Sequence, residues 1–187
     1  MSIERIRSET VFEGSIASVR VEEFRHPDGS TSVREVIGHP GAVAMVAHDD
    51  QWLYLVRQPR EAVREEALLE LPAGKLDVPG ESPLECARRE LAEEVGKAAS
   101  TWRELKRFYT SPGFAEEELI VYLATDLEDA SAQAEEEERI EVVSWPLEEL
   151  DEAIAECRDA KSLIGLLMFR DLRSARSPAD LRSAGDA

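Results

Sequence analysis

Acidic side chains gather in one short stretch of the chain, 89-RELAEEVG-96. Glu90 and Glu94 are four residues apart, which on a helix places them one turn apart, and Glu93 lies three residues from Glu90. Arg89 precedes Glu93 by four residues and can neutralise part of this charge. Hard divalent cations prefer oxygen ligands, so carboxylates at this spacing predict a metal site.

A solvated helix face is the alternative interpretation of this stretch. Like charges at helical spacing cost only a few tenths of a kcal/mol per pair, so energy alone does not decide between the two. The preceding segment 71-LPAGKLDVPG-80, followed by Glu81, favours a metal site. Such a loop can direct backbone carbonyls and a further carboxylate towards the same place.

The helix that positions these carboxylates has clear end signals. Ser82 suits the N-cap, Pro83 the first helical position, and Glu85 completes a capping box three residues after the cap. Gly96 supplies a stop signal. One face is apolar and should pack against a core, through Leu84, Ala87, Leu91 and Val95.

The remaining elements indicate an α/β fold. The segment 42–47 is almost entirely apolar and is typical of a strand buried on both faces, and a polar loop is expected after the next strand, at 52–57. Further strands are expected at 17–24, 31–37, 103–109, 118–124 and 140–145, and further helices near 147–157 and 162–173.

Charge and composition limit the possible functions. The chain of 187 residues carries 22 basic and 40 acidic residues, a formal net charge of -18, which argues against nucleic-acid binding. A small anionic substrate remains compatible if metal ions and a few arginines reverse the charge locally. The two cysteines form no zinc pattern or disulfide framework, and the longest apolar run, 163–169, is too short to cross a bilayer. We therefore expect a cytoplasmic protein with no membrane partner.

The motif around the helix resembles the signature of the Nudix hydrolases, through Gly74, Glu81, Arg89, Glu90, Leu91, Glu93, Glu94 and Gly96. The resemblance implies an α/β/α sandwich with a mixed sheet, preceded by an N-terminal antiparallel strand region. It implies Mg²⁺, with Mn²⁺ possible, bound by Glu90 and Glu94 with Glu93 assisting and the Ala73 carbonyl as a backbone ligand. Arg89 would orient the carboxylates.

Two positions depart from the family pattern. Six residues, 75-KLDVPG-80, separate Gly74 from Glu81 where the family usually has five, and Lys97 occupies a closing position that is usually apolar. The spacing from Glu81 through Gly96 is intact, and an extra loop residue costs little. The helical ligands should therefore be unaffected.

Outside the motif the chain resembles the ADP-ribose pyrophosphatase branch of the family. Pro112 follows Gly96 by sixteen residues, and 57-RQPR-60, 70-ELPAGK-75 and 113-GFAEEELIVYLA-124 agree with that branch. Turn chemistry is the alternative reading of Pro112 alone. The resemblance implies hydrolysis of ADP-ribose, a nucleoside diphosphate substrate, to AMP and ribose 5-phosphate.

Substrate contacts are expected from Arg57, Arg60, Pro112 and Gly113, although surface salt bridges explain the two arginines equally well. The resemblance places the general base in the loop before 140–145, where alignment favours Glu138 with Glu136 behind it. A solvated turn is the alternative for these acidic residues.

The resemblance further implies a homodimer in which residues 1–40 reach over the partner. Residues 41–176 would form the hydrolase domain and 177–187 a frayed tail. Two other functions remain open: hydrolysis of another nucleotide sugar or dinucleotide, and nucleotide sensing without catalysis.

Overall fold

The apolar strand β4 (Ala42–His48) lies at the centre of the larger sheet in the computed structural model, which describes residues 2–130 and 139–175. Its side chains alternate between two cores: Ala44 and Val46 face one side of the sheet, and Val43 and Met45 face the other. The prediction that this strand is buried on both faces is confirmed.

Within the described residues the larger sheet has seven strands and runs in the order β10-β5-β4-β9-β8. β6 pairs with β5, and β7 pairs with β4. β4 and β9 are parallel, whereas the other pairs are antiparallel, so the sheet is mixed. The strand bounds are β5 (Trp52–Arg60), β6 (Glu65–Glu70), β7 (Ala73–Lys75), β8 (Lys97–Tyr109), β9 (Glu118–Asp129) and β10 (Glu141–Pro146).

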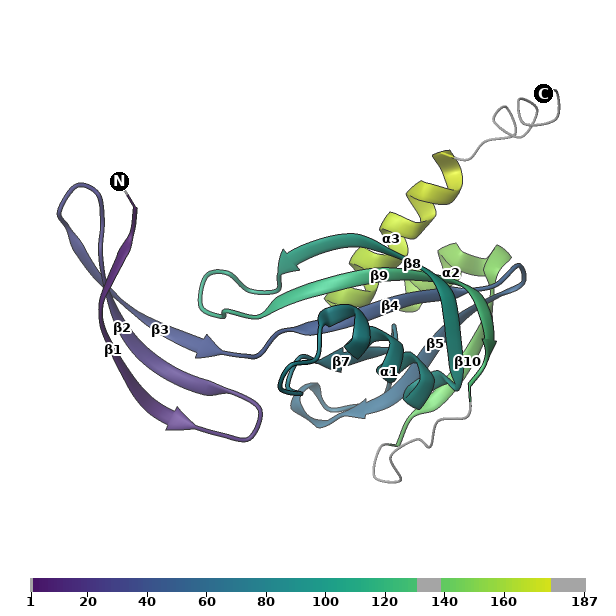
Figure 1. Cartoon of the computed structure of the whole chain (residues 1–187), viewed down its shortest axis with the longest axis horizontal. Coiled ribbons are helices and arrows are strands. Elements are labelled where there is room, and N and C mark those ends of the chain that lie inside the picture. The colour runs from purple at the N-terminus through teal and green to yellow at the C-terminus, as the bar shows by residue number, and fades with distance from the viewer. Residues whose placement is uncertain (1, 131–138, 176–187) are drawn as a thin grey trace.

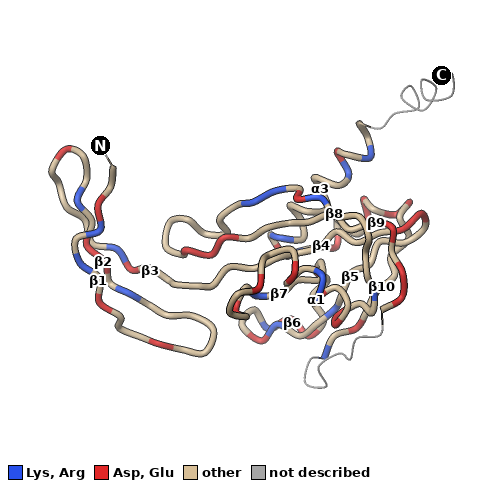
Figure 2. The backbone as a smooth tube through the Cα atoms, viewed as in Figure 1, with Lys and Arg blue, Asp and Glu red and all other residues tan. Residues whose placement is uncertain are grey.

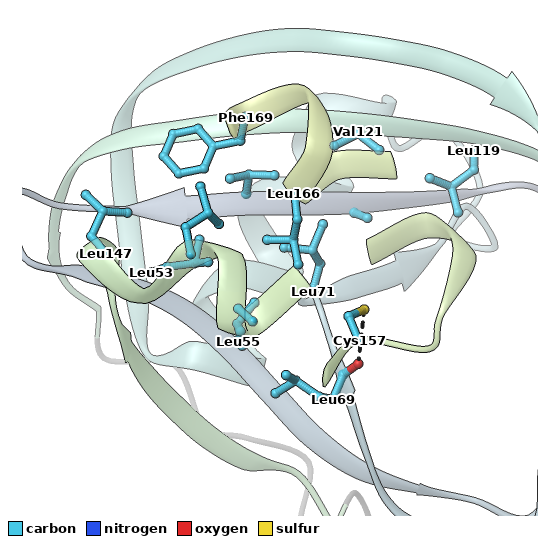
Figure 3. Packing of buried hydrophobic residues seen from close by; sticks show 14 of the residues in the cluster. Leu53, Leu55, Leu69, Leu71, Leu119, Val121, Leu147, Cys157, Leu166 and Phe169 are labelled. Carbon is cyan, nitrogen blue, oxygen red and sulfur yellow. Dashed lines mark hydrogen bonds between the residues drawn. The ribbon is translucent and has the colours of Figure 1, made fainter. Parts of the chain in front are cut away.

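Helices cover both faces of this sheet (Figure 1). Helix α1 (Pro83–Val95) packs on one face, and α2 (Leu150–Glu156) and α3 (Ala160–Ala175) pack on the other. Figure 3 shows the core under α3, where Leu166 and Phe169 meet Leu53, Leu71 and Val121. The expected α/β/α sandwich is confirmed.

The N-terminal residues form a separate antiparallel sheet of β1 (Glu4–Glu13), β2 (Ser18–Arg25) and β3 (Thr31–Gly38), as expected. This sheet extends away from the sandwich (Figure 1). β3 joins the sandwich at the loop after β8, where the Ile37 N–H donates to the Phe114 carbonyl at 2.7 Å and the Glu116 N–H donates to the Ile37 carbonyl at 2.9 Å. Basic and acidic residues both occur along the sheet (Figure 2).

Several elements differ from those expected. β1 was not predicted, since its charged sequence has no buried face and forms a strand through pairing with β2. The segment after β5 is not only a polar loop, because β6 pairs with β5 there. The helix expected at 147–157 begins with a 3₁₀ turn over Leu147–Glu149. The tail at 177–187 lies outside the described residues, and no helix among those described is long and apolar enough to span a membrane.

Candidate active site

Helix α1 begins and ends where its sequence predicts. Ser82 Oγ accepts a hydrogen bond from the Glu85 N–H, and the Glu85 carboxylate accepts one from the Ser82 N–H at 2.8 Å. Gly96 ends the helix with a φ of 70°, a left-handed conformation that favours glycine. These ends fix the extent of the helix, and Glu90 and Glu94 both project towards β7.

Arg89 contacts three carboxylates. Its Nε and Nη2 donate to the two oxygens of Glu81 at 2.9 and 3.0 Å, a forked pairing. Its Nη1 donates to Glu90 Oε1 at 2.8 Å and to Glu93 Oε2 at 2.9 Å. Hydrogen bonding to Glu81 raises the pKa of Arg89, and the same contact lowers the pKa of Glu81. Arg89 thus lies among the carboxylates that it was predicted to orient.

The other carboxylates lie against the backbone of β7. Glu94, only 8% exposed, accepts a hydrogen bond through Oε2 from the Ala73 N–H at 2.9 Å. Glu90 lies so close to Gly74 that a Cβ there would come within 2.1 Å of the Glu90 Cγ. Glycine is therefore required beside Glu90 because the carboxylate side chain occupies the space of a Cβ. Burial, with the nearby charge of Glu90, raises the pKa of the Cys86 thiol behind them to about 12.

Glu90 and Glu94 line a cavity of about 430 Å³. Ala73 and Gly74 also line it, and the rest of the lining has cationic, acidic, polar and apolar side chains. The other lining residues are Ile16, His39, Ala42, Gln58, Arg60, Lys75, Thr110, Glu117, Leu119, Asp159, Ala160 and Lys161.

Arg60 is held in this cavity by a buried carboxylate. Its Nε and Nη2 donate to the two oxygens of Glu70 at 2.6 and 2.8 Å, and Glu70 is only 1% exposed. Hydrogen bonding to Glu70 raises the pKa of Arg60, and the charge of Glu94 contributes to the same shift. Arg60 is therefore a cation on a preorganised wall of the cavity, close enough to Glu94 to respond to its charge.

The donor set fits a hard divalent cation. No group of three or more His, Cys, Asp or Glu side chains is placed to hold a metal ion in residues 2–130 and 139–175. Mg²⁺ is commonly held by one or two carboxylates together with waters and substrate phosphates, so Glu90 and Glu94 are sufficient for such a site.

Comparison with known proteins agrees with this geometry. Residues 38–164 match the Nudix domain, and residues 3–37 match the nucleoside diphosphate sugar hydrolase N-terminal domain. The chain belongs to the Nudix family. Members of this family generally use divalent metal ions, which agrees with the carboxylate pair on α1.

Three relatives illustrate the position of this Nudix protein in the family. It is 46% identical to an ADP-ribose pyrophosphatase of Mycobacterium tuberculosis over 76% of this chain and 69% of the relative. It is 40% identical to an ADP-ribose pyrophosphatase of Bacillus subtilis over 77% and 78%, respectively. The crystal structure of an ADP compounds hydrolase superposes with a TM-score of 0.82 at 26% identity, covering 95% of this chain and 97% of the other.

The predicted substrate-binding residues of this Nudix protein fall in different places. Arg60 lines the cavity with Glu90, whereas Arg57 pairs with Glu156 and does not line it. Pro112 and Gly113 line a second cavity of about 560 Å³, formed with residues of the N-terminal sheet. One copy of the chain therefore does not bring all four residues together.

The predicted general bases, Glu138 and Glu136, lie outside the described residues. The extra residue in the Nudix loop does not separate Glu81 from Arg89, since the two form the forked pair described above. Lys97, the residue that departs from the motif, begins β8. Its side chain pairs with Asp129 at 2.6 Å and does not line the cavity.

Sequence reasoning missed the residues behind the cavity wall. Asp159, just before α3, and Lys161 in its first turn line the cavity, as does His39, and Glu70 accepts a hydrogen bond from Lys161. The segment containing Glu70 was noted only for its resemblance to the family. Nothing local to 159–162 signals a contact with a residue some ninety positions earlier, because that contact depends on how α3 packs on the sheet.

Proposed function

We propose that this Nudix protein hydrolyses the pyrophosphate bond of ADP-ribose with one water and releases AMP and ribose 5-phosphate. The observation that carries the proposal is the cavity in which Glu90 and Glu94 lie on one wall and Arg60 on another. Relatives that are 46% and 40% identical are ADP-ribose pyrophosphatases, which supports this substrate.

The proposed metal is Mg²⁺, with Mn²⁺ as a substitute, held by Glu90, Glu94 and the Ala73 carbonyl, with Glu93 assisting. When bound there, the ion neutralises phosphate charge and lowers the pKa of a water molecule. Arg60, fixed by Glu70, donates to a phosphate or to the terminal ribose. Arg89 keeps Glu90 and Glu93 in place through its hydrogen bonds.

The metal ligands are tested by Glu90→Gln and Glu94→Gln. Each replacement removes a charged oxygen ligand, so we expect the rate of AMP release to fall by at least about a hundredfold, since even changes around ligands cost 10- to 100-fold. Glu152→Gln, on the exposed surface of α2, is the matched control. Wild-type rates in both variants would contradict the metal site.

The substrate is tested by chromatography of products from ADP-ribose beside a panel of other nucleotide sugars and dinucleotides, with and without Mg²⁺. We expect AMP and ribose 5-phosphate to form only with metal, and ADP-ribose to be cleaved faster than the other compounds. Faster cleavage of another compound would assign a different substrate. Binding without metal-dependent cleavage would favour a sensor.

Glu138, with Glu136 as the second candidate, is the proposed general base, which removes a proton from the attacking water. Glu138→Gln should lower kcat while leaving metal affinity unchanged. A normal kcat in this variant would move the role to another residue.

We also infer a homodimer. Every residue of β1 is exposed, and the N-terminal sheet leaves large apolar side chains uncovered, namely Ile6, Val11, Phe12 and Val33. Pro112 and Gly113 line a cavity together with this sheet and lie apart from Arg60. In a dimer, a partner that places its N-terminal sheet over the cavity of Glu90 and Glu94 would bring its own Pro112 and Gly113 to that site. Light scattering should give twice the chain mass for wild type and a lower mass for Phe12→Glu.

A cytoplasmic location is also proposed. Both cysteines, Cys86 and Cys157, are free and buried, which is compatible with a reducing compartment. Cell fractionation with an antibody to the protein tests this location.

A further inference from the structure

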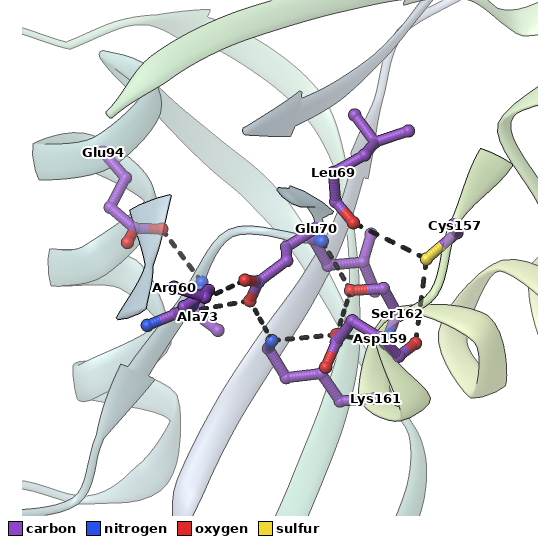
Figure 4. A network of polar contacts seen from close by, with 10 residues as sticks. Arg60, Leu69, Glu70, Ala73, Glu94, Cys157, Asp159, Lys161 and Ser162 are labelled. Atoms are coloured by element: carbon purple, nitrogen blue, oxygen red, sulfur yellow. Dashed lines mark hydrogen bonds and ion pairs between the residues drawn. The ribbon is translucent and has the colours of Figure 1, made fainter. Parts of the chain in front are cut away.

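A polar cluster joins Arg60, Lys161 and Asp159 of the cavity lining to Glu70 (Figure 4). Glu70 at the end of β6 accepts hydrogen bonds from Arg60, and its Oε2 also accepts one from Lys161 Nζ in the first turn of α3. Lys161 Nζ donates in addition to Asp159 Oδ2 at 2.8 Å. One buried carboxylate therefore holds two cations beside each other.

The position of Lys161 is fixed by the start of α3. Asp159 Oδ2 accepts hydrogen bonds from the Ser162 N–H at 3.0 Å and the Ser162 hydroxyl at 2.6 Å. The Ser162 Oγ in turn accepts one from the Leu71 N–H at 2.7 Å, which ties the helix start to the strand segment next to Glu70. Lys161 is therefore anchored from both sides and is not a mobile surface lysine.

Lys161 nevertheless reaches the cavity. Its side chain is 14% exposed, and it lines the cavity with Arg60 and Glu94. An ammonium group has three N–H donors, and the bonds to Glu70 and Asp159 use two of them. One donor thus remains for a ligand without any loss of the bonds that position the group.

Both carboxylates of the cluster are held in the ionised form by its two cations. Burial tends to raise the pKa of Glu70, but the bonds from Arg60 and the charge of Lys161 outweigh it, so the pKa of Glu70 is lowered. Burial likewise opposes ionisation of Asp159, and Lys161 again outweighs it and lowers that pKa. Both carboxylates are therefore charged at neutral pH and keep the two cations at the wall.

We propose that Lys161 is a second cationic contact for the diphosphate of the substrate, held beside Arg60 by Glu70. A forked guanidinium and a compact ammonium together match two adjacent phosphate groups, each of which presents several acceptor oxygens. The inference rests on the proposed function, in that the substrate is a nucleoside diphosphate, and it adds a residue that the Nudix motif does not contain.

The test is Lys161→Met, which keeps the aliphatic stem and removes the charge, and Lys161→Arg, which keeps the charge. Binding of ADP-ribose and of inorganic pyrophosphate is measured by calorimetry in buffer with EDTA, and the KM and kcat for ADP-ribose are measured with Mg²⁺. Arg158→Met is the matched control, because Arg158 lies three positions away, pairs with Glu65 and does not line the cavity.

We expect Lys161→Met to weaken binding of both probes about tenfold or more, the loss of one charge-assisted contact, and to raise KM more than it lowers kcat. Lys161→Arg should retain more binding than Lys161→Met, because it keeps the charge, and Arg158→Met should bind like wild type. Unchanged binding by Lys161→Met overturns the proposal and leaves Lys161 as a partner of Glu70 only.

Loss of folding in Lys161→Met is addressed by Lys161→Gln, which removes the charge but keeps N–H donors for Glu70 and Asp159. Lys161→Gln should likewise weaken binding of both probes, and wild-type binding in a folded Lys161→Gln overturns the proposal. If wild type forms no AMP from ADP-ribose while pyrophosphate binding depends on Lys161, the proposed function fails and the Lys161 contact stands. If wild type binds neither probe but hydrolyses ADP-ribose with Mg²⁺, the Lys161 contact is wrong and the proposed function stands; if it does neither, both are wrong.

Discussion

Strands β4 and β1 show how differently the two sheets of this chain are stabilised. Six of the seven residues of β4 are buried, whereas all ten residues of β1 are exposed. β4 has helices on both sides, while the N-terminal sheet contacts the sandwich mainly where β3 meets the loop after β8. Main-chain pairing is thus enough to define a sheet, but a hydrophobic core is what stabilises one.

Both sheets also bury one glutamate, and the two environments are comparable. Glu22 in β2 accepts hydrogen bonds from Arg5, Ser8 and Arg20, much as Glu70 accepts them from Arg60 and Lys161. The difference lies in what surrounds the pair: Glu70 supports a cavity wall, and Glu22 joins two strands of an isolated sheet. The tryptophans Trp52, Trp102 and Trp145 lie only in the sandwich, so their fluorescence reports on that part.

The largest contrast is expected between core and surface truncations. Leu53→Ala removes a fully buried side chain and should lower the free energy of unfolding by about 2–5 kcal/mol. Phe12→Ala, at a side chain that is 59% exposed, should change it by less than about 0.5 kcal/mol in the tryptophan-monitored urea transition. Equal losses would show that the two sheets unfold as one unit.

Glu70 should make the sandwich sensitive to acid. Because its pKa is lowered from the usual 4.5, its contribution to stability is present above that value and is lost as the pH falls through the lowered pKa. Glu70→Gln should cost about 1.5–3 kcal/mol at neutral pH, the range for a hydrogen bond to a charged group, and should flatten the acid dependence.

Urea titrations at a series of pH values test this prediction, with Glu22→Gln as the comparison. Glu22→Gln should leave the urea midpoint of the tryptophan-monitored transition unchanged at each pH, since Glu22 lies in the N-terminal sheet. An equal shift in both variants would remove the distinction between the two buried glutamates.

Gly74→Ala should have an intermediate effect. The added Cβ would overlap the Glu90 side chain, so we expect a loss of about 1–3 kcal/mol together with slower hydrolysis as the carboxylate is displaced. For stability, Gly113→Ala is the control, because a Cβ there meets no atom within 4 Å. Thermal unfolding of the two variants should therefore differ, and equal melting temperatures would contradict the close packing of Glu90 on β7.

Ser82→Ala should have a smaller effect than Gly74→Ala. It removes the capping hydrogen bond to the Glu85 N–H and should cost about 0.5–2 kcal/mol. Hydrolysis should change little, because Gly96 still ends the helix and the Glu94 contact with Ala73 remains. A loss of activity much larger than the loss of stability would mean that the cap also sets the position of the carboxylates.

The sequence by itself determined the elements that depend on neighbours in the chain. Local hydrogen bonding sets the ends of α1 at Ser82 and Gly96, and the helical period places Glu90 and Glu94 one turn apart. The apolar run of β4 indicates a strand that is buried on both faces. These features were enough to predict the helix and a metal site at its carboxylates, whereas the sandwich was expected from the resemblance to the Nudix family.

Only the tertiary structure decided which distant residues share a cavity. It brought Lys161 to Glu70 across ninety-one positions, kept Arg57 away from the cavity, and placed Pro112 beside the N-terminal sheet. The physical reason is that the contact of Lys161 with Glu70 arises from packing α3 against the sheet. A buried ion pair of this kind has no periodicity in the sequence, since it depends on two surfaces that meet only after the chain has folded.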